Sequence, residues 1–353
     1  MRYALWIGLV LLVFARFITS QPTYIDGQKI RITTRISTEP TMSTFYQNLN
    51  LAGLKISLPR YPEIHYGDEV VVEAVVADKN LKDPVLISIS ETKSIFPKIR
   101  NLFLSFYGRN FPQPDASLIA GIVLGAKTSL PKDFWGSLTK TGTAHIVVAS
   151  GMNVTFVAGF LMSVLVLFLK RKIAIPVALA GIWFYSALSG FDAPIVRAAI
   201  MGSVAFSAQE LGRLLNAYKA LFLTGLIMLI IVPQWLTDIG FILSFVATLS
   251  LMVFEKKIEK FAKFLPGFFK EGFATSLAAQ IGVAPILFVT FGQFNILSPV
   301  INALVLWTIP PIMIIGALAG VIGVIFEPFG RLILYLAYPL TWWFIFIIRI
   351  FNF

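Results

Sequence analysis

The residues best suited to chemistry lie in one stretch, from Gly142 to Asn153 (GTAHIVVASGMN). It places His145 in an apolar run and, five residues later, Ser150 before a glycine. A histidine and a serine could be the base and nucleophile of a hydrolase, but this spacing separates them by about 140° around a helix. The G-x-S-x-G elbow of such enzymes is also absent. The pattern therefore favours a kinked or unwound helix whose freed backbone groups face a cavity.

His145 has uses that require no catalysis. The unperturbed pKa of an imidazole lies near neutrality, so the side chain could gate a pathway, bind a phosphate or take part in proton movement. A histidine that caps or bridges helices is an equal alternative. Polar side chains at membrane depth cost free energy, and they are usually kept for a pathway or a close helix contact.

A second candidate is Arg197, which lies one turn into an apolar segment. A guanidinium buried in a membrane needs an anion or backbone carbonyls around it. We therefore expect Arg197 to line a pathway or to pair with Asp192 or Asp238. The two aspartates also fit helix N-caps, because Asp192 precedes Ala-Pro and Asp238 precedes Ile-Gly.

A third series mixes amides with helix breakers. Its members are Gln280, Pro285, Phe291-Gly292, Asn295, Ser298-Pro299, Asn302 and Pro310. Amides in lipid seek hydrogen-bond partners on neighbouring helices. Packing between helices and the lining of a cavity are equal alternatives for this series.

The composition indicates a polytopic membrane protein. Hydrophobic residues make up 57% of the 353 and charged residues 13%, against about 25% charged in an average soluble domain. The absence of cysteine excludes disulfides and thiolate metal sites. The two histidines, His65 and His145, are too few and too far apart for a histidine-based metal cluster. We expect no metal and no cofactor.

The apolar runs predict a mostly α-helical fold with about 8 to 10 membrane segments. After residue 150 these runs are 154–169, 173–188, 193–208, 220–232, 239–254, 273–291, 296–326 and 332–350. Basic clusters follow alternate runs, which places them in the cytoplasm by the positive-inside rule and puts residues 23–141 outside. Pro310-Pro311 predicts that the run 296–326 is broken or re-entrant.

The first 141 residues predict three different parts. Residues 1–20 read as a transmembrane anchor, with a signal peptide as the alternative. Residues 21–93 alternate in polarity, and their roughly five short strands suit a small external OB-like β-barrel. Residues 94–141 predict amphipathic helices that lie on the membrane surface or cover a helical bundle. The remaining 142–353 form the polytopic domain.

OB-like barrels often bind single strands through aromatic and basic side chains. The candidates here are Tyr46, Lys55, Arg60, Tyr61 and Tyr66. However, residues 20–93 carry eight Lys/Arg and nine Asp/Glu, whereas the whole chain carries a net charge of +11. Since strand binding depends on cations that neutralise phosphates, a soluble β spacer with an ordinary surface is the competing interpretation.

Several ordered motifs together resemble the competence domain of the ComEC family, which are membrane channels for DNA uptake. They are G-x-x-H-x-x-x-x-S-G at 142–151, P-x-x-R-A at 194–198, D-x-G-F-x-L-S-F at 238–245 and the amide series from Gln280 to Asn302. The resemblance covers about residues 95–350, and the β domain fits the family's external OB-like domain. It implies that one DNA strand passes from the outside to the cytoplasm. The resemblance implies that the His145–Asn153 stretch and Arg197 line or shape this pathway. The full set of candidates for lining or gating is His145, Ser150, Gly151, Asn153, Asp192, Arg197, Asp238, Gln280, Asn295 and Asn302.

The chain departs from many family members at its end. It reaches Phe353 without the H-x-H-x-D-H run of a metallo-β-lactamase-like nuclease, and it has no Walker A motif. We therefore expect a channel component of the cytoplasmic membrane that is not an enzyme. An external DNA receptor or nuclease and a cytoplasmic ATP-driven helicase or strand-binding protein would be its partners, beside membrane lipids. A secondary transporter for a smaller anion and a non-transporting scaffold are the alternatives.

Overall fold

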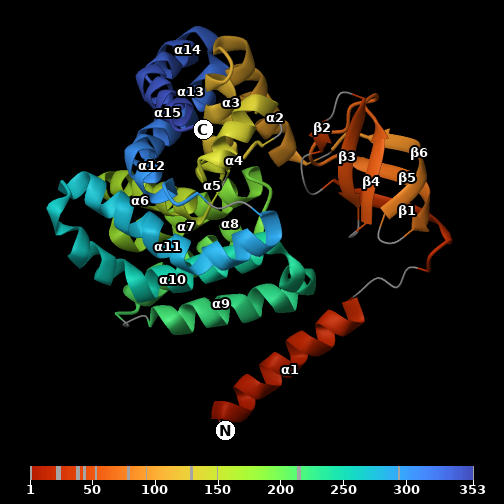
Figure 1. Cartoon of the computed structure of the whole chain (residues 1–353), viewed down its shortest axis with the longest axis horizontal. Helices are drawn as coiled ribbons and strands as arrows, with labels where there is room; N and C mark the ends of the chain where they lie inside the picture. Colours follow the sequence, from red (N-terminus) through yellow and green to blue (C-terminus); the bar gives the residue numbers. More distant parts are fainter. Residues whose placement is uncertain are drawn as a thin grey trace.

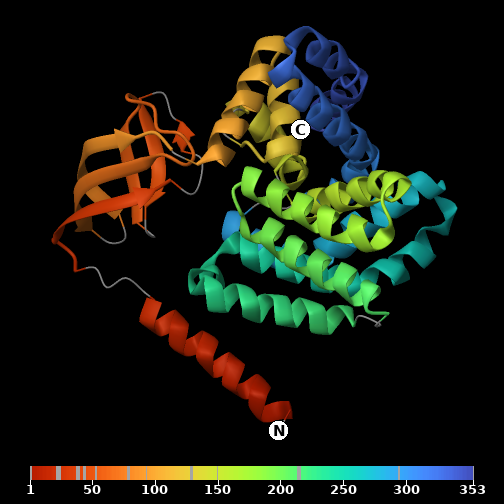
Figure 2. The same cartoon turned by 180° about the vertical axis from the view of Figure 1, so that it is seen from behind.

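The computed structural model describes residues 2–20, 25–36, 40–42, 45–51, 54–77, 80–92, 94–127, 130–148, 150–212, 216–292 and 295–352. Figure 1 shows a β domain on one side of a larger helical body. The N-terminal helix α1 (Arg2–Ser20) contacts α9 (Ala217–Ile231) and the 3-10 turn η1 (Pro233–Thr237). Figure 2 gives the same arrangement from behind.

Six strands form one sheet, and their alternating side chains build its core. The strands are β1 (Lys29–Arg35), β2 (Thr41–Met42), β3 (Tyr46–Leu51), β4 (Leu54–Pro59), β5 (Glu69–Ala77) and β6 (Asn80–Ser90). Their order is β1-β5-β6-β4-β3-β2; the pair β4–β6 is parallel and the other pairs are antiparallel. In β4 every second residue is buried, which gives Leu54, Ile56 and Leu58 one shared inner face.

The two edges of this sheet are neighbours in the chain. Arg35 ends β1 and Thr41 begins β2, six residues later, so the edges lie within about 22 Å of each other at 3.6 Å per residue. Among the described residues no ladder joins β1 to β2, so the structure shows an open mixed sheet rather than the closed barrel that the sequence predicts.

The first helices after the β domain pack against the last helices of the chain. This compact group consists of α2 (Ile95–Asn110), α3 (Asp115–Leu124), α13 (Ile309–Ile325), α14 (Glu327–Tyr335) and α15 (Tyr338–Ile350). In α13, a Cβ at Gly323 would lie 2.3 Å from the ring of Phe106, and a Cβ at Gly320 would lie 2.5 Å from the ring of Phe103. The glycines of α13 thus admit the aromatic rings of α2 into close contact.

α3 corrects the prediction of surface helices over residues 94–141. All ten of its residues are buried, and it contacts α2, α13 and α15. It is a core helix and does not lie on a surface. α2 and α4 (Lys132–Lys140) are buried on one side only, which agrees with the amphipathic pattern.

The other helices form the remainder of the body below the compact group in Figure 1. They are α6 (Gly151–Phe168), α7 (Arg171–Leu188), α8 (Ala193–Glu210), α9, α10 (Ile239–Phe261) and α11 (Gly267–Phe291), with η2 (Ala262–Phe264) between the last two. The short helices α5 (Ala144–Val147) and α12 (Ser298–Val305) lie between this set and the compact group.

Five helical stretches of the described chain are long and apolar enough to cross a membrane. They are Gly151–Phe168, Arg171–Leu188, Ile239–Phe261, Phe269–Thr290 and Ser298–Ile325, and α14 with α15 would be a sixth if that pair, bent by 48°, is one span. The multi-pass prediction agrees, but its count of 8 to 10 is larger. α8 is not among the five, and α9 is only 15 residues long.

The predicted break in 296–326 falls at the 3-10 turn η3 (Leu306–Thr308). Pro310 and Pro311 stand in the first turn of α13, where an intrahelical N–H is not required. The break is therefore local, and 298–325 continues as one stretch of 28 residues.

Candidate functional site

The Gly142–Asn153 stretch is broken between its histidine and its serine. His145 lies in α5 and is exposed, Val148 is extended, and Ser150 is the extended N-cap residue of α6. The Ser150 hydroxyl donates to Asn153 Oδ1 at 3.3 Å. The expected interruption of the helix is therefore present, and Ser150 is held by Asn153 rather than by a histidine base.

Asn153 ties α6 to the compact group. Its side chain is fully buried, and its Nδ2 donates to the backbone oxygen of Ile122 in α3 at 2.9 Å. This hydrogen bond fixes the first turn of α6, where Ser150 and Gly151 also lie. Asn153 therefore has a positioning role.

Arg197 stands where three helices meet. Its Nε donates to Ser244 Oγ of α10 at 2.7 Å, and a Cβ placed on Gly151 of α6 would lie 2.6 Å from its terminal nitrogen Nη2. A side chain at position 151 would displace the Arg197 guanidinium from this place. In the described part of the chain, Arg197 has no carboxylate within ion-pair distance.

The expected pairing of Arg197 with an aspartate is therefore wrong. Asp192 occupies the N-cap position of α8 without capping it through its side chain, and its carboxylate lies 3.8 Å from Lys127 Nζ. Asp238 caps α10, because its Oδ1 accepts a hydrogen bond from the Phe241 backbone N–H at 2.7 Å. The capping prediction is confirmed for Asp238.

The amide series meets the beginning of the Gly142–Asn153 stretch in one hydrogen-bonded seam. Gln280 Nε2 donates to the Asn295 backbone oxygen at 2.9 Å, and Asn295 Nδ2 donates to the Lys140 backbone oxygen at 2.7 Å. Ser298 donates to the Gly142 backbone oxygen at 3.3 Å. The seam joins α4, α11 and α12 across more than 150 residues of sequence.

Two acceptors in this seam are left over. Asn302 Nδ2 donates to Ser276 Oγ at 2.6 Å, but Asn302 Oδ1 and Gln280 Oε1 are buried and find no hydrogen-bond partner among the residues that the structure describes. Unpaired buried oxygens cost free energy. The amides thus serve helix packing and still present unused polar atoms, which supports both of the roles considered for them.

Arg100 is the functional side chain that sequence reasoning missed. It is 3% exposed. Its guanidinium donates to the backbone oxygens of Leu124 and Leu188, the latter at 2.8 Å, and lies 5.4 Å from the ring centre of Tyr66. Leu124 and Leu188 are the last residues of α3 and α7. The last four carbonyl groups of a helix have no partner within the helix, and Arg100 provides hydrogen bonds to one of them in each helix. A signal existed: Arg100 follows Pro97 and precedes Phe103 at the three-residue spacing of the buried face.

The β-domain candidates separate into two sets. Tyr66 faces the helical body, since its ring lies over Arg100 and would be 3.4 Å from a Cβ on Gly190. It joins the two parts of the molecule, so its assignment to a free binding face is wrong.

The other four candidates lie on the outside of the β domain. Tyr46 and Tyr61 are 55% and 69% exposed, and the Arg60 guanidinium lies 5.7 Å from the Tyr61 ring centre. Lys55 is exposed at the opposite end of the β3–β4 hairpin, because Tyr46 pairs with Pro59 and Asn50 with Lys55. Phe45, which the sequence did not single out, is 76% exposed beside Tyr46.

Comparison with known proteins identifies the family. Residues 122–353 match the family described as Competence protein. The chain belongs to this family. Its ComEC-type resemblance is thereby confirmed at the level of the family.

Relatives of this Competence protein are distant. It is 26% identical to ComE operon protein 3 of Bacillus subtilis (strain 168) over 236 residues, which is 66% of this chain and 30% of the relative. It is 28% identical over 201 residues to an uncharacterized protein of Aquifex aeolicus (strain VF5), covering 57% and 45%. It is 25% identical to competence protein ComA of Neisseria gonorrhoeae, covering 59% and 32%. The matches thus cover less than half the length of each of these relatives, and no solved structure matches.

The Competence match divides the candidate residues. The Gly142–Asn153 stretch, Arg197 and the amide seam lie inside residues 122–353. Arg100 and the β domain precede it. The described residues contain no group of three or more His, Asp or Glu side chains that could hold a metal ion.

Proposed function

We propose that this protein conducts single-stranded DNA across the cytoplasmic membrane during DNA uptake. The observation that carries the proposal is Arg197, a guanidinium in the Competence region that has no carboxylate partner among the described residues. A cation held in this way between membrane helices favours an anionic cargo. The names of two relatives, a ComE operon protein and competence protein ComA, favour DNA as that anion.

The remaining candidate residues shape the pathway in different ways. Asn153, Asp238 and Asn295 position helices through their hydrogen bonds. His145 is exposed beside the helix break and acts as a gate. Gln280 and Asn302 offer the unused oxygens of the seam. Gly151 and Ser150 set the close approach of α6 to Arg197.

The β domain would capture the strand outside the membrane. We propose that it is an OB-like domain. Its two edge strands, β1 and β2, follow each other in the sequence after a short connection, as they would if they were two halves of one strand that closes a barrel. Phe45, Tyr46 and Tyr61 supply exposed rings for base stacking, and Arg60 supplies a cation beside them. Lys55 extends this surface along the hairpin.

The chain in this proposal performs no chemistry of its own. An external receptor or nuclease would deliver the strand, and a cytoplasmic ATP-driven helicase or strand-binding protein would pull it inward. Membrane lipids surround the apolar helices.

The test uses the full chain reconstituted in vesicles that enclose a single-strand nuclease. A fluorescent oligonucleotide added outside is expected to be cleaved inside, and Arg197→Gln is expected to slow cleavage at least tenfold. Asp192→Asn is the matched control, because that carboxylate faces Lys127 and not Arg197. Entry of nucleotides or phosphate without entry of oligonucleotides would instead establish a transporter for a smaller anion. If neither enters, the non-transporting scaffold is the interpretation that remains.

A further inference from the structure

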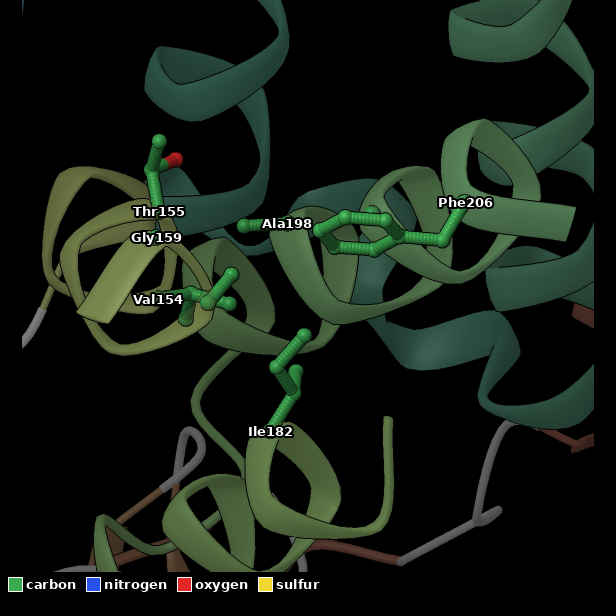
Figure 3. Close-up of a pocket in the computed structure, with 8 residues that line it drawn as sticks. Val154, Thr155, Gly159, Ile182, Ala198 and Phe206 are labelled. Atoms are coloured by element: carbon green, nitrogen blue, oxygen red, sulfur yellow. The ribbon is translucent and has the colours of Figure 1, made fainter. Parts of the chain in front are cut away.

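A cavity of about 230 Å³ lies between α6 and α8, with α7 on a third side. Figure 3 shows Val154 and Thr155 of α6, Ile182 of α7, and Ala198 and Phe206 of α8 around it. An engineered apolar cavity of about 150 Å³ is enough to bind benzene. The space between α6 and α8 is therefore large enough for a ring of an incoming molecule.

Two glycines keep this space open. A Cβ added to Gly159 or Gly202, which both line the cavity, would find nothing within 4 Å. At Gly181 in α7, by contrast, a Cβ would lie 2.4 Å from Leu161, so there the glycine serves close packing. Among the described residues no contact requires glycine at 159 or 202, and side chains at these two positions would narrow the cavity.

The lining suits a flat and largely apolar group. It consists of aliphatic side chains, the Phe206 ring and one hydroxyl, that of Thr155. This hydroxyl already donates to the Gly151 backbone oxygen at 3.1 Å. The lining can therefore pack against the faces of a ring, but it has few hydrogen-bonding groups that could distinguish the polar edges of different rings.

A cation stands one helical turn from this cavity. Ala198 lines the cavity, and its Cβ and Arg197 Nη2 would lie 3.3 Å and 2.6 Å from a Cβ on Gly151. Gly151 and Thr155 are one turn of α6 apart, about 5.4 Å along the axis. An anion at Arg197 and a flat ring in the cavity would thus be close enough to belong to one nucleotide.

We propose that the cavity holds one base of the passing strand while Arg197 pairs with the neighbouring phosphate. The inference rests on the proposed function, and it adds a site that binds one nucleotide of the strand at a time. Stacking tolerates every base, because each presents a π-face. The site is therefore expected to bind all four bases with similar affinity.

The test compares two probes on the full chain in nanodiscs of neutral lipid. One is a fluorescent oligodeoxythymidylate, and the other is an abasic oligonucleotide with the same number of phosphates. Wild type is expected to bind the first about fivefold or more tightly than the second, as one stacked base provides. Gly202→Leu fills the cavity and is expected to lower this preference about fivefold, to what the exposed rings of the β domain provide, while leaving the abasic affinity unchanged. Arg197→Gln is expected to weaken both.

Controls separate a filled cavity from a damaged protein. Gly108→Leu introduces the same side chain on α2, where a Cβ also meets nothing within 4 Å, and it should keep the preference. Gly159→Leu fills the cavity from α6 and should repeat the result of Gly202→Leu. If both cavity variants fold and retain the full wild-type preference for bases, the proposal is refuted.

An acyl chain of a lipid is the competing occupant. The Trp183 indole donates to Ser203 Oγ at 3.2 Å, next to Gly202 in α8, so brominated acyl chains in the cavity would quench its fluorescence. If Gly202→Leu relieves this quenching and still binds the base-containing probe with the full preference, the cavity is occupied by lipid and the proposal is overturned. Failure of the proposed function looks different, since wild type would then bind the oligonucleotide without admitting it to vesicles.

Discussion

The compact group and the α10–α11 hairpin both contain helices apolar enough to cross a membrane, but they are held in different ways. In the stretch 298–325, which ends in α13, 44% of the 18-residue window is buried by the rest of the chain, against 11% in the spans of α10 and of α11. α13 is held mainly by contacts with other helices of the same chain. α10 and α11 instead contact chiefly each other and leave most of their surface to lipid or to other molecules.

The way backbones approach each other explains this difference. In the compact group, Gly330 of α14 would place a Cβ 2.2 Å from Gly323 Cα of α13, which is contact between two backbones. In the hairpin, the nearest atom to a Cβ on Gly282 would be Ser250 Cβ at 2.6 Å. Ser250 Cβ is fixed to the α10 backbone as Gly323 Cα is to that of α13, but α13 packs against more α-helices, and the backbone of a packed helix shifts only with its neighbours.

The largest effect is therefore expected from Gly330→Ala. Its methyl group would separate α14 from α13, and overpacking of this kind costs about 3 kcal/mol. We expect a matching loss in the free energy of unfolding, measured by denaturant titration in lipid micelles. Gly108→Ala on α2 meets open space and is the matched control. Equal stability of the two variants would show that α14 and α13 can separate by the width of a methyl group without cost, which would contradict the rigid packing of the compact group.

The second effect concerns the polar anchor of the compact group. Arg100→Met keeps most of the apolar length but removes the hydrogen bonds to Leu124 and Leu188 and the contact with Tyr66. Hydrogen bonds from a charged group contribute about 1.5–3 kcal/mol, so a loss of about 2 kcal/mol is expected in the same titration.

Arg109→Met on the same helix serves as the comparison for Arg100. Arg109 is exposed and lies 3.7 Å from Glu327, an arrangement that contributes little to stability. If Arg109→Met destabilised the protein as much as Arg100→Met, burial would not be what distinguishes the two arginines.

The sequence predicted local features well because they depend on neighbouring residues. The break between His145 and Ser150 follows from their own segment, and the cap at Asp238 needs only the three residues after it. The alternation of β4 gave its buried face in the same way.

Features that depend on distant segments could not be predicted. α3 is apolar enough for a core or a surface, and its burial depends on α13 and α15, which follow about 190 and 220 residues later. Asp192 was expected to cap α8 or to pair with Arg197, but its side chain makes no cap and the fold brings Lys127 to it. Tyr66 looked like a binding residue because the sequence does not show Gly190 and Arg100 beside it.

The smallest effect compares one type of hydrogen bond in both regions. The Tyr107 hydroxyl donates to the Gly316 backbone oxygen at 2.9 Å in the compact group, and the Ser250 hydroxyl donates to the Ala278 backbone oxygen at 2.6 Å in the hairpin. Each acceptor lies within a helix, so Tyr107→Phe and Ser250→Ala remove a bond without leaving a new unpaired donor.

Such bonds between membrane helices contribute about 0.6 kcal/mol on average and at most about 1.7. We therefore expect similar small losses for Tyr107→Phe and Ser250→Ala in the denaturant titration. Equal losses would mean that the two regions differ in packing and not in the strength of their polar contacts. A Tyr107→Phe loss several times the Ser250→Ala loss would instead assign part of the rigidity of the compact group to its hydrogen bonds.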